Sequence, residues 1–99
     1  MGKNLNLNKD IEEKVISFLR KRGAKKISIF GSYLRGEATP ESDLDIIVEF
    51  DKGISLLDIV GFELDLSEQL DIKVELLTEK AISPYIIKDV LAEAKVIYG

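Results

Sequence analysis

The chain has 99 residues, of which 45% are hydrophobic and 32% are charged, and its formal net charge is -4. This length predicts one domain, residues 1–99, with a single small core. A negative net charge argues against nucleic acid as the main partner, because binding to a phosphate backbone depends on many Lys and Arg contacts. Cys and His are both absent, which excludes disulfides, thiolate nucleophiles and the usual zinc sites. Any catalysis must therefore use carboxylates, hydroxyls, Lys, Arg or a metal ion.

The first six residues are polar and lack the apolar run of a signal peptide. The longest obvious apolar stretches, such as residues 46–48, are too short to span a bilayer. These features predict a cytoplasmic protein that does not interact with membranes.

A helix is predicted to begin after Asn8, a suitable N-cap, and to end near Gly23. Acidic residues at positions 10, 12 and 13 suit the helix dipole, and an apolar stripe follows at helical spacing. The stripe consists of Ile11, Val15, Phe18 and Leu19. Residues 26–30 alternate and are β-branched, so they predict a strand that runs directly into Gly31 and Ser32.

Residues 33–36 suit a short helical turn, and residues 37–42 are predicted as a loop because Pro40 disfavours helix before it. Residues 44–50 form the second predicted strand. Because strand side chains alternate, Asp43 and Asp45 share one face with Ile47 and Glu49. The other face carries Leu44, Ile46, Val48 and Phe50.

Ser55 can cap a helix that reaches about Leu70. Its inner face is predicted to carry Leu57, Val60, Leu64 and Ser67. Residues 72–77 predict a third strand, with Glu75 on the same face as Lys73 and Leu77.

Ser83 followed by Pro84 predicts the start of a last helix, and residues 96–98 suit a terminal edge strand. The apolar stripe of this helix would consist of Ile86, Ile87, Val90, Leu91 and Ala94. The element order predicts an α+β, two-layer (α/β) fold in which a small mixed β-sheet is flanked by helices.

Residues 31–45 concentrate the chemistry of the chain. Only about a dozen residues separate the first two strands, which favours an antiparallel pair with Gly31 close to the start of the second strand. Gly31 lets backbone N–H groups approach a phosphate closely, and the Ser32 hydroxyl adds a donor. Asp43 and Asp45 supply the hard oxygen ligands that suit Mg²⁺ bound together with substrate phosphates.

Two metal ions held by such a pair can activate a hydroxyl and neutralise the leaving group of an in-line displacement. Glu75 is the predicted third ligand, and Asp71 is the less favoured substitute. Arg35 could contact a triphosphate or be a solvated cation. Simpler explanations also fit each part: Gly31 and Ser32 suit an ordinary turn, and the aspartates suit the solvated face of an edge strand.

A family resemblance rests on motifs in this region and spans about residues 25–98. The residues that carry it are Gly31-Ser32, Arg35-Gly36, Ser42-Asp43-Leu44-Asp45 with the apolar residues 46–48, Val74-Glu75-Leu76 and Ser83-Pro84-Tyr85-Ile86. They resemble the signature of the polymerase-β-like nucleotidyltransferase superfamily. More closely, the chain is similar to a minimal nucleotidyltransferase of the MNT type.

The resemblance implies a palm-like nucleotidyltransferase core that transfers a nucleoside monophosphate from a magnesium–triphosphate, with ATP as the expected substrate and two Mg²⁺ ions. It implies that Gly31 and Ser32 hold the triphosphate, that Asp43 and Asp45 ligate magnesium, and that Glu75 replaces a third aspartate. Leu34 also departs from the family, which commonly has a small Ala at that position.

The resemblance further implies an antitoxin that inactivates a helical HEPN-type ribonuclease toxin by adding AMP to a tyrosine. A binding-only antitoxin that masks its partner is the alternative. Transfer to a small molecule such as an aminoglycoside is disfavoured, because the chain lacks room for an acceptor domain. The sequence is also compatible with association of the chain into an oligomer.

Overall fold

The computed structural model describes residues 7–51 and 53–99. Its elements in chain order are α1 (Lys9–Arg20), β1 (Ala24–Phe30), α2 (Ser32–Arg35), β2 (Leu44–Phe50), α3 (Leu56–Leu70), β3 (Val74–Leu77), the 3-10 helix η1 (Glu79–Ala81), α4 (Ile87–Glu93) and β4 (Lys95–Tyr98). The prediction that residues 1–6 lack a signal segment lies outside the described residues. Within the described ranges, every helix is too short or too polar to cross a bilayer.

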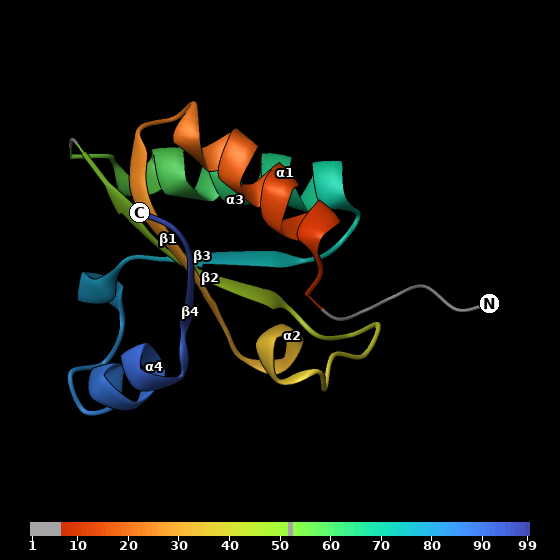
Figure 1. Ribbon diagram of the computed structural model, residues 1–99. Coiled ribbons are helices and arrows are strands. Elements are labelled where there is room, and N and C mark those ends of the chain that lie inside the picture. The colour runs from red at the N-terminus through yellow and green to blue at the C-terminus, as the bar shows by residue number, and fades with distance from the viewer. Residues whose placement is uncertain (1–6, 52) are drawn as a thin grey trace.

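The strands form one mixed sheet in the order β3-β2-β1-β4 (Figure 1). β1 pairs antiparallel with both β2 and β4, and β2 pairs parallel with β3. The parallel pair arises because α3 carries the chain back from the end of β2 to the start of β3. Helices α1 and α3 lie on one side of the sheet, and α2 and α4 lie on the other (Figure 1). The predicted small mixed sheet flanked by helices is therefore confirmed.

The predicted N-caps of the first and third helices are present. Asn8 Oδ1 accepts the Ile11 N–H at 3.0 Å, and Ser55 Oγ accepts the Asp58 N–H at 3.1 Å. β3 begins two residues later than predicted, because the helical hydrogen bonding of α3 continues into residue 72.

The core lies between the sheet and the α1–α3 layer. All four residues of the predicted stripe on α1 are buried, and so are the residues that alternate toward this side on the central strands. From the strands these are Ile27, Ile29, Leu44, Ile46, Val48, Val74 and Leu76. The apolar stripe of α1, which has a 3.6-residue period, thus packs against the apolar face of the strands, which has a two-residue period.

The predicted inner face of α3 is wrong at three of its four positions, and only Ser67 is half-buried and in contact with the sheet. Leu57, Val60 and Leu64 are exposed, whereas Leu66 is fully buried and Ile59 and Phe62 pack against the core. The error has a physical cause: α3 carries apolar residues on two faces, so its periodicity does not identify the face that meets the sheet.

The last helix differs from its prediction in both start and packing. α4 begins at Ile87, because the Ser83 carbonyl accepts the N–H groups of both Ile86 and Ile87 and holds the preceding residues in turns. No residue of α4, all of which is described, is buried. The predicted stripe therefore does not build the core, and Ile86 and Leu91 remain largely exposed.

Candidate functional site

The predicted carboxylates lie around the start of β2. Asp45 stands opposite Phe30 of β1 on one side and opposite Glu75 of β3 on the other. Directly paired residues point to the same face of a sheet, so Asp45 and Glu75 share a face. Asp43 precedes β2 by one residue and is close enough for its charge to act on Asp45. The sheet therefore brings together the three carboxylates that the sequence singles out.

The electrostatics of Asp45 reflect this crowding. The pKa of Asp45 is raised from 3.8 to about 6, first by burial and then by the negative charges of Glu75 and Asp43. A hydrogen bond with Glu75 raises the pKa further, while the positive charge of Arg35 opposes the shift. Crowded carboxylates of this kind are stabilised by a cation.

Gly31 brings the backbone against Asp45. Its φ is +81°, in the region that favours glycine, and a Cβ at this position would overlap Asp45 Oδ2 and lie 3.3 Å from Asp45 Cγ. The chain then enters α2 at Ser32, whose side chain is half-buried. Gly31 and Ser32 thus lie next to the aspartates, as the antiparallel pairing of β1 and β2 requires.

Arg35 points toward α4. Its Nη1 lies 2.6 Å from Glu93 Oε1, and its Nε lies 3.2 Å from Glu37 Oε1. The hydrogen bond and charge of Glu93 raise the pKa of the Arg35 guanidinium above its ordinary value. Exposed ion pairs of this type are weak, so a triphosphate could compete for Arg35.

Lys73 and Glu93 are site neighbours that the sequence reasoning missed. Lys73 Nζ lies 3.7 Å from Asp43 Oδ1. Strand alternation could have found Lys73, since it lies two residues before Glu75 on the same face. No local signal could have found Glu93, because its contact with Arg35 joins residues 58 positions apart.

The donor set suits magnesium, although the side chains do not yet form a cage. Asp43, Asp45 and Glu75 offer the hard oxygen atoms that Mg²⁺ prefers, and the pKa of Asp45 is raised by burial and by the negative charges of Glu75 and Asp43. Within residues 7–51 and 53–99, no group of three or more acidic side chains already has the arrangement needed to hold a metal ion. A magnesium ion held by all three carboxylates would therefore require these side chains to reorient.

Comparisons with known proteins show which family the chain resembles. A family model described as "Nucleotidyltransferase domain" matches residues 12–97. A Methanocaldococcus jannaschii protein named a putative protein adenylyltransferase is 46% identical over 90 residues, which cover 91% of this chain and 96% of the relative. Protein adenylyltransferase MntA from Thermococcus cleftensis is 42% identical over 76 residues, which cover 76% of this chain and 77% of the relative.

A solved structure of a toxin–antitoxin with AMP-PNP contains a chain with the same fold. Its TM-score is 0.80 and its sequence identity 28%, and the match covers 89% of this chain and 73% of that chain.

Proposed function

Because the chain belongs to the nucleotidyltransferase domain family, we propose that it transfers AMP from ATP to a hydroxyl group of a partner protein and acts as that partner's antitoxin. The partner is a helical, HEPN-type toxin, and the acceptor is a tyrosine. The observation that carries this proposal is the position of Asp45, between the close backbone of Gly31 and the carboxylate of Glu75. The names of the two relatives and the AMP-PNP complex of the structural neighbour support it.

The proposed reaction is an in-line displacement at the α-phosphorus of ATP. The acceptor oxygen forms a bond to this phosphorus, while the bond to the oxygen that bridges to the β-phosphate breaks. AMP stays on the acceptor and pyrophosphate leaves. Glu75 takes the proton of the acceptor hydroxyl, since a carboxylate within reach of the nucleophile can act as a general base.

Each site residue has a role in this proposal. The backbone at Gly31 and the hydroxyl of Ser32 bind the triphosphate, and Arg35 joins them when it leaves Glu93. Asp43, Asp45 and Glu75 would hold magnesium. When bound, the metal neutralises phosphate charge and lowers the pKa of the attacking hydroxyl.

A second candidate function is neutralisation by binding alone. One observation favours it: Asp43 is paired with Lys73 and Arg35 with Glu93, so the described site is not yet arranged around a triphosphate. In that case the chain would mask its partner without modifying it.

A label-transfer assay tests the proposal. The chain is incubated with Mg²⁺, ATP labelled at the α-phosphate and the purified protein encoded by the adjoining gene. We expect label on a tyrosine of that protein, and we expect Asp43→Asn/Asp45→Asn to abolish the transfer.

The matched control is Asp10→Asn/Glu13→Gln, which neutralises two exposed carboxylates of α1, a helix that contributes no candidate site residue. This variant should label the acceptor as well as the wild type does. Toxin neutralisation that occurs without label, and that survives Asp43→Asn/Asp45→Asn, would instead establish the binding-only function.

A further inference from the structure

We propose that the exposed apolar face of α3 is the docking surface for the acceptor protein, which presents an apolar helix face rimmed by Lys or Arg. The surface, here named the α3 stripe, consists of Leu56, Leu57, Val60 and Leu64. Their exposed fractions are 76%, 83%, 45% and 64%. The identity of the docked protein as the acceptor rests on the proposed function, whereas the existence of the surface does not.

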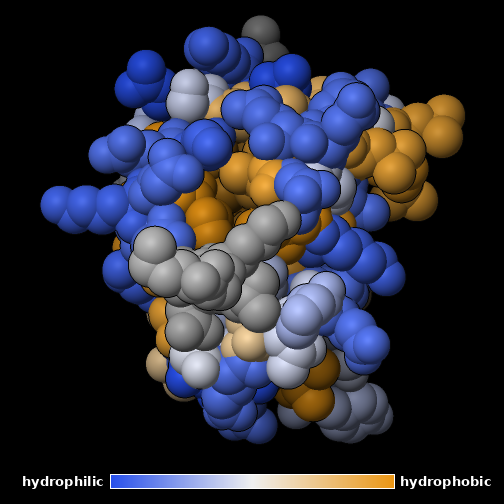
Figure 2. All heavy atoms as spheres, turned by 90° about the vertical axis from the view of Figure 1, so that its right-hand side faces the viewer, coloured by the Kyte–Doolittle hydropathy of each residue, from blue (hydrophilic) through white to orange (hydrophobic). Residues whose placement is uncertain are grey.

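The α3 stripe is comparable in size to the largest apolar patch on a typical monomeric protein. Its side chains recur at helical spacing on one side of α3, and the opposite side carries the buried Leu66. Together they expose on the order of 400 Å² of apolar surface, a size typical of functional patches. Figure 2 shows hydrophobic side chains protruding at the upper right, on the side of the molecule where α3 lies behind α1 in Figure 1.

The charge around the stripe selects the kind of partner. Helix α3 carries Asp58, Glu63, Asp65 and Glu68 and no Lys or Arg. If two copies of the chain met through this helix, like charges would face each other, which opposes association. A protein whose apolar face is rimmed by basic residues matches both the stripe and its acidic border.

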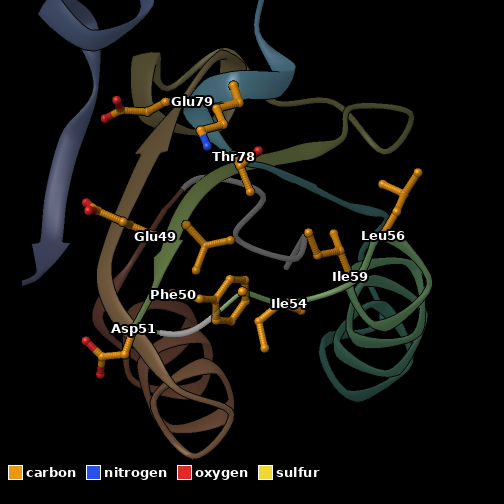
Figure 3. Close-up of a pocket in the computed structure, with 11 residues that line it drawn as sticks. Glu49, Phe50, Asp51, Ile54, Leu56, Ile59, Thr78 and Glu79 are labelled. Carbon is orange, nitrogen blue, oxygen red and sulfur yellow. The ribbon is translucent and has the colours of Figure 1, made fainter.

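A hollow at the N-terminal end of the stripe can receive an anchoring side chain. It has a volume of about 540 Å³ and lies between the end of β2, the start of α3 and η1. Figure 3 shows Phe50 and Ile59 on opposite sides of this space, with Thr78 at its top and Leu56 at its rim. Interfaces derive much of their affinity from a few anchors buried in such pockets.

A second hollow lies at the other end of the stripe, between α3 and the start of β3. It has a volume of about 460 Å³, and both Leu64 and Lys73 line it. Lys73 in turn contacts Asp43. The stripe is about 12 Å long from Leu56 to Leu64, so a helix that follows it ends at this second hollow. The partner would thus contact α3 from the first hollow to the second.

The test measures binding of the protein encoded by the adjoining gene to the full chain by calorimetry. We expect Leu57→Lys/Leu64→Lys to weaken binding at least tenfold. The matched control, Tyr85→Lys/Ile86→Lys, replaces two exposed apolar residues before α4 and should stay within twofold of the wild type. Asp65→Lys/Glu68→Lys tests the charged border without altering apolar residues, and it should weaken binding most strongly at low salt.

The outcomes separate this proposal from the proposed function. The Asp43→Asn/Asp45→Asn variant should bind the partner normally yet transfer no AMP, so a wild type that binds but does not transfer leaves the docking surface intact. Unchanged binding by Leu57→Lys/Leu64→Lys, or no binding by the wild type, overturns the docking surface. A wild-type dimer that this variant dissociates into monomers in light scattering also overturns it, because the stripe would then bind a second copy.

Discussion

The contact between Gly31 and Asp45 sets the geometry of the site at the scale of single residues. Gly31 combines a positive φ with a backbone that leaves no space for a Cβ beside Asp45. Asp45 is in turn pressed against Glu75, which helps to raise its pKa. A phosphate that binds the Gly31 backbone would therefore lie next to the carboxylates that would hold its metal ion.

Gly31→Ala should destabilise the fold by roughly 2 to 3 kcal/mol, because strain in φ and overlap with Asp45 act together. Gly36→Ala is the matched control: φ is +75° there, but nothing lies within 4 Å of the added Cβ. Its cost should be about 1 kcal/mol. Urea denaturation of both variants measures the difference, and equal losses would contradict the close contact.

Asp45→Asn should stabilise the metal-free protein at neutral pH. The pKa of Asp45 is about 6 in the folded state and 3.8 for an unperturbed aspartate, so between these pH values the folded state binds more protons than the unfolded state. Stability from this group is complete below pH 4 and is lost as pH rises through 6. Solvent screening of a half-buried carboxyl reduces the expected gain of Asp45→Asn to about 1 kcal/mol at pH 7.5.

Denaturation curves in EDTA from pH 3.5 to 7.5 test this expectation. The two proteins should be equally stable at pH 3.5 and should diverge between pH 4 and 6. A wild type that gains stability relative to Asp45→Asn across that window would show that the pKa of Asp45 is lowered instead.

At the scale of elements, α3 packs against the core on one face and carries the α3 stripe on another. Its side chains also protect an edge of the sheet. β3 is an edge strand, and two of its N–H groups are bound by side chains of α3. Ser67 Oγ accepts the Val74 N–H at 2.9 Å, and Glu63 Oε2 accepts the Leu76 N–H at 2.8 Å. These bonds block an edge that could otherwise pair with another chain.

Glu63→Ala should therefore cost about 1 to 2 kcal/mol and speed the hydrogen exchange of the Leu76 amide, which would lose its acceptor. Glu68→Ala, at an exposed position of the same helix, serves as the control and should change neither quantity appreciably. Exchange of the Leu76 amide is followed by NMR. An unchanged rate in Glu63→Ala would show that this bond does not protect the edge.

At the scale of the whole molecule, the sheet order assembles the site from distant parts of the chain. β2 lies between β1 and β3, so Gly31, Asp45 and Glu75 meet although the sequence separates them widely. Arg35 on α2 is held by Glu93 at the end of α4. If a nucleotide bound Arg35 and broke this contact, its binding would be coupled to the position of α4.

Glu93→Gln should strengthen ATP binding roughly threefold, because Arg35 would then be free to contact phosphate. Arg35→Gln should weaken it by a similar factor, and Glu13→Gln on α1 should leave it unchanged. Calorimetric titration with ATP and Mg²⁺ provides the affinities. Identical affinities in Glu93→Gln, Arg35→Gln and the wild type would exclude Arg35 from the nucleotide site.

Much of the fold follows from local patterns in the sequence. Caps at Asn8 and Ser55 and the two-residue period of residues 44–50 predict elements that the structure contains. The same period places Asp43 and Asp45 toward one side. These features are predictable because they depend on neighbours a few residues apart.

The sequence by itself determined the order of elements, the antiparallel first pair of strands and the three carboxylates of the candidate site. Only the tertiary structure decided that Glu75 stands directly beside Asp45, that Arg35 binds Glu93, and that α3 buries Leu66 and exposes Leu57. The reason is physical: periodicity records what alternates along one segment, whereas register, ion pairing and the choice between two apolar faces depend on segments far apart in the chain.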